Sequence, residues 1–480
     1  MKIITITAIF AALVWAMGCL PDTSGVDPPT DQLIFPVGLA VVGENDNRYL
    51  LVANSNFNLK YNAGTIVAVD LKELESIEEK IQPEDGRVPD AGLEYLSEDK
   101  KDLFIPDDQL IKADQTIRLG SFASDLELTP RKNRAIIPVR GKRRIVIVDV
   151  DPSNGGENLM SCSAEDERTC DTGHHVESND QVSLPIEPYE IATLEYSFVN
   201  RDDEGNPTST TFTTMGFATH LSGGEVSMFR IDKVEIDQAE IDQAETLIPE
   251  LLTIDPELLT VDTSVLPGAS GIAANSSRGE IYVSGRRDPS PHLAIMKTKG
   301  NDLASVERKP YFDNAGSISF GSDLYGGTDA RGVAVTQSGD TIFLVTRTPE
   351  ALLKIDTADR EIVDMTTLGA DPSVVALYEA GLDTPDPSDD ITTAWVLCFL
   401  SDQVYIVESN NMQVHVRTTG FGPHAIAFDK VKERAYIANF RESTITVINT
   451  TWPYGHVGFI YGDTKANIKI GKPRLPSGHS

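Results

Sequence analysis

A three-part pattern of apolar and polar residues near the C-terminus sets the expectation for the fold. Residues 425–428 are apolar throughout, 435–439 form a second largely apolar run, and 444–448 alternate apolar and hydroxyl side chains, as a half-buried strand does. Charged or polar residues at 429–434 and 440–443 separate these runs and are typical of turns. The pattern predicts three short strands, a unit that cannot bury its apolar residues without neighbours of the same kind.

The same arrangement recurs along the chain about seven times, as expected for a repeat architecture. Clear copies begin at 38, 125, 271, 332 and 425, and two weaker copies with long insertions begin at 189 and 374. Second strands centred on Val345, Leu397 and Ile437 lie 52 and 40 residues apart, and the second spacing is near the ~40–45 residues of a four-stranded blade. We therefore predict an all-β fold, a seven-bladed β-propeller with loop insertions. A β-sandwich of short strands is the alternative, but a sandwich would not repeat the same three-strand sequence pattern about seven times.

Short phrases within these copies carry a resemblance to a known repeat. The second strands at 51–54, 282–285 and 436–439 read LVAN, YVSG and YIAN, and several third strands end in Val-Asp or Ile-Asp. These phrases resemble the YVTN-type β-propeller repeat, although none reads YVTN literally. The resemblance covers roughly residues 35–460. It implies a propeller of the kind found in envelope or surface-layer interaction proteins, many of which have no assigned activity.

Residues 1–18 have the pattern of an N-terminal targeting signal. Lys2 supplies a positive start, and residues 3–17 form an apolar run that is too short to span a membrane comfortably. Small residues then precede Cys19. We interpret this segment as a lipoprotein signal peptide.

The ending of that signal resembles a bacterial lipobox, although Ala16 stands where Leu is usual. The resemblance implies that Cys19 is diacylated and becomes the mature N-terminus, with plain secretion as the alternative. Leu20 follows the cysteine, so the Asp that retains some lipoproteins at the inner membrane is absent. The expected location is the Gram-negative cell envelope, anchored by lipid, in the outer membrane.

The rest of the chain divides into a tether, the repeat body and a tail. Residues 19–33 are rich in Pro and Asp, which favours an extended, solvated tether. The propeller is predicted over 34–465, and the tail over 466–480 contains a late apolar strand that could pair with the first blade and close the ring. Within the insertions, 71–81 has helical spacing, and a duplicated pentamer at 235–244 is interpreted as a local duplication in a surface loop.

The formal net charge of −32 argues against strongly anionic binding partners. Nucleic acid and anionic lipid surfaces would be repelled by this field, so contact with a membrane is expected through the lipid anchor alone. The acidic residues lie mostly in the insertions and are interpreted as solubilising, with attraction of Ca²⁺ or of a basic partner as the alternative. We expect a monomer.

The four cysteines lie in different sequence surroundings, which predict different roles. Cys162 and Cys170 lie eight apart in one exported loop, where a disulfide is the default. His174 and His175 follow and permit a zinc hypothesis, but adjacent histidines are hard to direct at one tetrahedral ion. Cys398 lies in an apolar strand and is expected to be a free, buried thiol.

Other metal and catalytic motifs are weak. Residues 149–153 and 202–206 begin as calcium loops do, yet the first lacks the glycine and closing glutamate of a complete site and the second is only similar. Gly-x-Ser-x-Gly, His-Glu-x-x-His and Walker motifs do not occur. No catalytic residue, metal site or cofactor is assigned, and Ca²⁺ is the one candidate ion.

Propeller geometry predicts a binding site without any motif. The first strand of each blade lines the central channel, so residues just before these strands should ring one mouth of it. Convergent polar groups in a concave mouth are the usual binding-site hypothesis, whereas the plain alternative is that they only hydrogen-bond water. The predicted ring consists of Asp125, Tyr189, Glu190, Ser270, Arg331, Ser373 and His424.

These observations predict a lipid-anchored envelope propeller that binds a protein or glycan ligand without catalysis. The competing function is an enzyme on the same scaffold with its site at the channel mouth, of the lactonase-like hydrolase or the quinoprotein-like dehydrogenase kind. A purely structural spacer is a third class.

Overall fold

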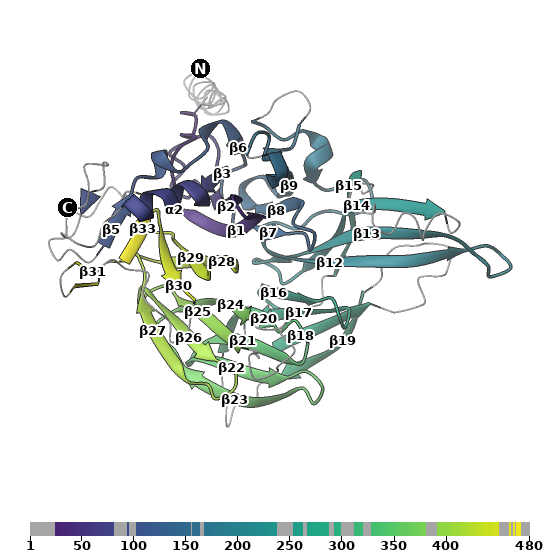
Figure 1. The fold of residues 1–480 in the computed structure, drawn as a ribbon. Helices are drawn as coiled ribbons and strands as arrows, with labels where there is room; N and C mark the ends of the chain where they lie inside the picture. Colours follow the sequence, from purple (N-terminus) through teal and green to yellow (C-terminus); the bar gives the residue numbers. More distant parts are fainter. Residues whose placement is uncertain are drawn as a thin grey trace, which may run out of the picture.

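The computed structural model is a ring of seven β-sheets, the blades of a β-propeller (Figure 1). This confirms the predicted all-β, seven-bladed fold. The blades follow one another in chain order, each running from an inner first strand to an outer strand. The structure describes residues 25–80, 94–95, 102–154, 156–163, 168–237, 253–262, 266–287, 292–298, 312–319, 328–380, 391–450, 460–461, 464–465 and 467–471.

Four antiparallel strands form most blades. Blade 1 contains β1 (Pro36–Glu44), β2 (Asn47–Asn54), β3 (Thr65–Asp70) and β6 (Ile117–Arg118). Blade 2 contains β7 (Glu127–Leu128), β8 (Arg134–Val139) and β9 (Arg144–Val150), with β10 (Met160–Ser161) and β11 (His175–Val176) both on β9. Blade 3 contains β12 (Pro188–Arg201), β13 (Pro207–His220), β14 (Val226–Asp237) and β15 (Thr253–Asp262). Blade 4 contains β16 (Ala269–Asn275), β17 (Glu280–Gly285), β18 (His292–Thr298) and β19 (Phe312–Ser319).

The second half of the ring repeats the pattern. Blade 5 contains β20 (Thr328–Val335), β21 (Thr341–Thr348), β22 (Glu350–Asp356) and β23 (Glu361–Thr367). Blade 6 contains β24 (Pro372–Ala380), β25 (Ile391–Cys398), β26 (Gln403–Glu408) and β27 (Val414–Thr418). Blade 7 contains β28 (Pro423–Asp429), β29 (Arg434–Asn439), β30 (Thr444–Asn449) and β33 (Asn467–Ile470), and then β5 (Asp102–Ile105) and β4 (Glu94–Tyr95). A separate hairpin pairs β31 (Ile460–Tyr461) with β32 (Thr464–Lys465).

Blade 7 closes the ring with strands from both ends of the chain. The C-terminal strand β33 pairs antiparallel with β30 and parallel with β5, which belongs to the long insertion of blade 1. Ile468 and Ile470 of β33 are fully buried. The propeller therefore extends to Ile470, past the expected boundary at 465, and the late strand joins blade 7 rather than the sheet of blade 1.

One α-helix, α2 (Leu71–Lys80), occurs among the described residues, where helical spacing was predicted. Leu71, Leu74 and Ile77 point into the apolar cluster that blades 7 and 1 share. Five 3₁₀ turns complete the described helices, at Asp107–Gln109, Ala113–Gln115, Arg140–Lys142, Pro152–Asn154 and Thr172–His174. None of the described helices has the length and apolar character needed to cross a membrane.

The described part of the predicted tether lies against blade 1 rather than free in solvent. The Leu33 amide donates to Asp107 Oδ2 at 2.9 Å, and the Asn62 amide donates to the Val26 carbonyl at 3.1 Å. Burial of Leu33 explains this attachment. Residues 1–24, including Cys19 and the predicted signal peptide, lie outside the described residues.

Cys162 and Cys170 form the predicted disulfide, with 4.6 Å between their Cα atoms. His174 is held by two carboxylates: Nδ1 lies 2.8 Å from Asp171 Oδ1, and Nε2 lies 3.2 Å from Asp149 Oδ2. The zinc hypothesis fails because both sulfurs are used in the disulfide. Cys398 is a free, fully buried thiol, as predicted.

The two loops with calcium-like beginnings are hydrogen-bonded turns. Asp151 Oδ1 accepts from the Ser153 amide at 2.9 Å, and Asp202 Oδ1 accepts from the amides of Glu204 and Asn206. Side-chain oxygens that satisfy their own backbone in this way are typical of Asx turns. The second half of the duplicated pentamer lies outside the described residues, and the first half begins at the end of β14.

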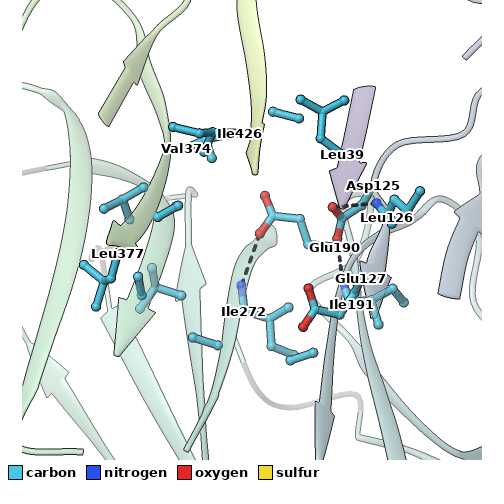
Figure 2. Close-up of a pocket in the computed structure, with 18 of the residues that line it drawn as sticks. Leu39, Asp125, Leu126, Glu127, Glu190, Ile191, Ile272, Val374, Leu377 and Ile426 are labelled. Carbon is cyan, nitrogen blue, oxygen red and sulfur yellow. Dashed lines mark hydrogen bonds between the residues drawn. The ribbon is translucent and has the colours of Figure 1, made fainter. Parts of the chain in front are cut away.

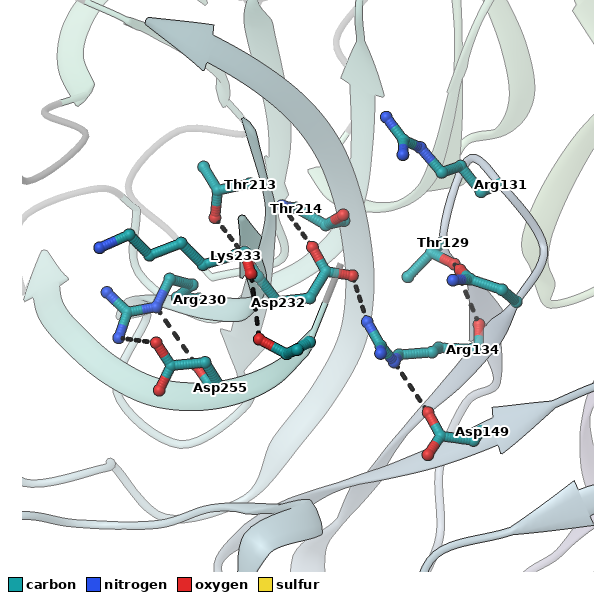
Figure 3. Close-up of polar contacts among 12 residues, drawn as sticks. Thr129, Arg131, Arg134, Asp149, Thr213, Thr214, Arg230, Asp232, Lys233 and Asp255 are labelled. Carbon is teal, nitrogen blue, oxygen red and sulfur yellow. Dashed lines mark hydrogen bonds and ion pairs between the residues drawn. The ribbon is translucent and has the colours of Figure 1, made fainter. Parts of the chain in front are cut away.

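Buried ion pairs tie neighbouring blades together. In Figure 3, Arg134 on blade 2 extends towards Asp232 on blade 3, and its Nε donates to Asp149 at 2.8 Å. Asp232 is almost fully buried and also accepts from the Thr214 amide at 2.9 Å. Nearby, Arg230 pairs with Asp255 at 2.7 Å. The Arg134–Asp232 pair joins blades 2 and 3, and removing either partner would leave a buried charge unpaired.

Candidate functional site

The central channel opens on one face of the ring, which we call the mouth face. It is formed by the residues just before each first strand and by the connections between second and third strands, at 55–64, 140–143, 221–225, 286–287, 349, 399–402 and 440–443. All of these connections lie at the same end of the blades because successive strands are antiparallel.

The structure brings three of the seven predicted residues into one cavity. Asp125, Glu190 and His424 come from the starts of blades 2, 3 and 7, and they line a channel cavity of about 500 Å³. Tyr189 and Arg331 lie beside it. Most of the remaining cavity wall is apolar.

The other two predicted residues hold strands in place. Ser270 is almost fully buried, and its hydroxyl donates to the Ala330 carbonyl of blade 5 at 3.2 Å. The Ser373 hydroxyl donates to Leu397 of its own blade at 3.5 Å. These two hydroxyls donate to backbone carbonyls, and neither residue lines the channel cavity.

Figure 2 shows the carboxyl groups of Asp125, Glu127 and Glu190 directed into the same space. Asp125 Oδ2 accepts from the Ile191 amide at 3.0 Å, and Glu190 Oε2 accepts from the Ile272 amide at 3.3 Å. Each of these two carboxyls thus joins its own blade to the next one. The carboxyl oxygens have further lone pairs that remain available to the cavity.

Burial changes the protonation of this carboxyl cluster. Burial raises the pKa of Asp125 to about 6, although two backbone amides oppose the shift. Burial and then the charge of Asp125 raise the pKa of Glu127 to about 8 and that of Glu190 well above its usual value. Near pH 7 this cluster therefore combines the Asp125 carboxylate, which accepts hydrogen bonds, with the protonated carboxyls of Glu127 and Glu190, which can donate them.

Two further predicted residues are uncharged near neutral pH. Burial, and then the neighbouring Glu190, raise the pKa of Tyr189 to about 12. Burial lowers the pKa of His424 to about 4. The His424 ring centroid lies 5.7 Å from that of Phe440, so the imidazole serves as part of an aromatic wall.

Three arginines gather on blades 4 and 5 at the mouth face. Burial, and then the positive charge of Arg331, lower the pKa of both Arg286 and Arg347. Arg331 pairs with Asp329 and Arg347 pairs with Asp371, each at 2.7 Å. Among the described residues Arg286 has no carboxylate partner. This side of the mouth can accept an acidic group.

Exposed apolar side chains gather on blades 6, 7 and 1 of the same face. We call Phe57, Leu59, Leu400 and Phe421 the apolar patch; they are between 50% and 61% exposed. Phe57 stacks edge-on against Phe440, with 5.3 Å between ring centroids. The patch therefore rests on packed aromatic rings, and exposed apolar groups in such a cluster are typical of an interaction surface.

Sequence reasoning missed much of this face. Glu127 could have been found because it lies two positions after Asp125 and so shares its side of the strand. Arg286 lies on the connection after β17 and Arg347 lies near the end of β21, and the residues of the apolar patch are far apart in sequence. No regular spacing in the sequence links such residues, because they become neighbours only when the blades form the ring.

Comparisons with known proteins agree on the fold alone. No family model matches the chain, and no curated protein matches its sequence. Hydrazine synthase of Kuenenia stuttgartiensis is similar in structure, with a TM-score of 0.49 and 10% identity over 90% of this chain and 99% of the other. The Cps50 (Swd1) β-propeller domain of Myceliophteria thermophila has a TM-score of 0.40 and 10% identity over 85% and 95%. AztD of Citrobacter koseri has a TM-score of 0.38 and 9% identity over 91% of each chain.

Proposed function

We propose that the protein is a non-catalytic binding propeller of the cell envelope that engages a protein partner through its mouth face. The observation that supports this function is the pairing of the apolar patch with the three arginines around one channel mouth. Aromatic residues and arginine are the side chains most enriched at protein interfaces. A partner segment with apolar residues next to an acidic group would complement both sides.

The partner is tested by cross-linking in intact envelopes. A photo-reactive amino acid at position 57 or 421 should give a discrete cross-linked protein, whereas one at position 363 should not. Val363 is a matched control because it is 57% exposed but lies on the outer strand β23. Equal cross-linking at all three positions, or binding of purified envelope glycan without any protein, would argue against a protein interface at the mouth.

The apolar patch should also contribute most of the binding free energy for the protein partner. Serine at positions 57, 400 and 421 together is expected to weaken partner binding at least about tenfold, because central apolar contacts dominate interface energies. Serine at Val363 and Val416, on the outer strands of blades 5 and 6, should leave binding unchanged. Partner binding is measured by titration with the cross-linked protein once it is purified.

Envelope attachment is proposed to depend on Cys19. The Cys19→Ala variant should move from the membrane fraction to the soluble periplasmic fraction, because at least two acyl chains are needed for stable anchoring. Mass spectrometry of the mature N-terminus measures the lipid directly. A wild-type N-terminus without acyl groups would support plain secretion instead.

An enzyme with its site at the channel mouth would require different evidence. The described residues contain no group of three or more His, Cys, Asp or Glu placed to hold a metal ion. A stoichiometric ion in the purified mature protein, lost in an Asp125→Asn, Glu190→Gln variant, would favour the hydrolase.

A further inference from the structure

A second cavity lies between blades 1 and 2, outside the channel. It has a volume of about 330 Å³, and we call it the seam pocket. Its polar wall comes from β6, β9, β11 and the connections beside them. The described residues that line it are Asn62, Ala63, Arg118, Leu119, Gly120, Lys142, Arg144, Val146, Thr169, Cys170 and His175.

The charge of this pocket is opposite to that of the whole chain. Two arginines and a lysine line it, and none of the described lining residues is acidic, although the chain has 73 acidic and 41 basic residues. Burial, and then Arg144, lower the pKa of the fourth basic residue, His175, which favours its neutral form. Asp27 pairs with Arg118 at 3.0 Å and Glu177 with Arg144 at 2.7 Å, but both acids are substantially exposed. Exposed pairs of this kind contribute little, so a ligand can compete for the arginines.

Local packing holds the cations in place around the pocket. A Cβ on Gly120 would lie 2.8 Å from Lys142 Cγ, so glycine at this position lets the lysine stem pass close to the backbone. The guanidinium of Arg144 lies against the His175 ring, with Nη1 3.3 Å from Nδ1. Among the described residues Lys142 has no carboxylate partner.

The described end of the disulfide loop, at Thr169 and Cys170, forms another part of the pocket wall. Cys170 lines the pocket, and the Arg118 amide donates to the Arg168 carbonyl at 2.7 Å, which joins the loop to blade 1. Thr169 also forms a parallel bridge with Arg118. The Cys162–Cys170 bond thus positions this wall against β6.

We propose that the seam pocket binds an oxyanion carried on a monosaccharide-sized molecule, such as a sugar acid or a sugar phosphate. Guanidinium groups match carboxylate and phosphate oxygens in two-point contacts, and Lys142 adds a compact positive charge. The apolar wall of Ala63, Leu119 and Val146 leaves room for the uncharged body of the ligand. The seam pocket shares the connections at 55–64 and 140–143 with the mouth face but lies outside the channel cavity, and its test does not require the proposed protein partner.

Calorimetric titration of the purified protein tests the proposal with four probes: galacturonate, galactose, inorganic phosphate and inorganic sulfate. Galacturonate should bind and galactose should not. Phosphate or sulfate with equal affinity would identify the bare oxyanion as the ligand, whereas weaker binding of both would show that the sugar body contributes. The absence of binding by every anion, or equal binding of galactose and galacturonate, would overturn the proposal.

Matched charge variants locate the site. Lys142→Gln and Arg144→Gln should each weaken galacturonate binding at least about tenfold, as loss of a charge-assisted contact predicts. Lys430→Gln changes the net charge equally at an exposed turn of blade 7 and should leave affinity within about twofold of wild type. Equal weakening by Lys142→Gln and Lys430→Gln would exclude the seam pocket. Because Lys142 is exposed, its variant keeps the test valid even if Arg144→Gln does not fold.

Discussion

Arg48→Met is expected to lower the free energy of unfolding by about 3–5 kcal/mol, because it removes one partner of a buried ion pair. Arg48 and Asp429 are only 2% and 1% exposed, and they join blade 1 to blade 7 where the ring closes. A second guanidinium nitrogen pairs with Glu75 on α2, and Nε donates to the Asn45 carbonyl at 2.7 Å. Methionine would fill much of the volume but leave the buried Asp429 carboxyl without its cationic partner. Chemical denaturation monitored by circular dichroism measures the change.

Two comparison variants separate the ion pair from simple loss of packing. Adding Asp429→Asn to Arg48→Met should recover part of the lost stability, because the stranded charge is gone. Lys72→Met removes a partner of Asp46 in an exposed pair and should have little measurable effect. If Arg48→Met were no more destabilising than Lys72→Met, the Arg48–Asp429 pair would not be what holds blades 1 and 7 together.

The ring could be predicted because its information is local. Each blade repeats short apolar runs separated by turn residues, and residues 435–439 are buried throughout β29, as their largely apolar sequence predicts. The closure could not be predicted. It depends on parallel pairing of β33 with β5, two four-residue strands separated by most of the chain. Strands of four residues are too short to show a distinctive apolar pattern, and the strand with which each one pairs depends on the completed ring.

The candidate site, like the fold, could be predicted only in part from the sequence. Asp125, Glu190 and His424 were found because their positions at or just before the start of a first strand follow directly from blade topology. Their roles were not predictable, since burial determines whether a carboxyl is charged and burial depends on the facing blades. Arg286 was missed because its position on a connection acquires meaning only when blades 4 and 5 place the guanidinium of Arg331 beside it.

The carboxyl cluster of the channel should make the protein less stable as pH rises. Burial raises the pKa of Asp125 to about 6 and that of Glu127 to about 8. Below about pH 4 both groups are protonated in the folded and unfolded chains, so they cause no difference. Above that pH the unfolded chain loses these protons first. Each group then lowers the free energy of unfolding by about 1.4 kcal/mol per pH unit, until the folded chain loses the same proton. The loss from Asp125 is complete near pH 6 and that from Glu127 near pH 8.

Glu127→Gln isolates one part of this effect because glutamine resembles the protonated side chain. The variant should match wild type near pH 4 and exceed its free energy of unfolding by about 2–5 kcal/mol at pH 8. Glu361→Gln, on the exposed outer strand of blade 5, should run parallel to wild type across the range. Denaturation at pH 4 to 8.5 measures all three proteins. A constant difference between Glu127→Gln and wild type would mean that Glu127 is ionised in the channel, and the donor character assigned to this cavity would then be wrong.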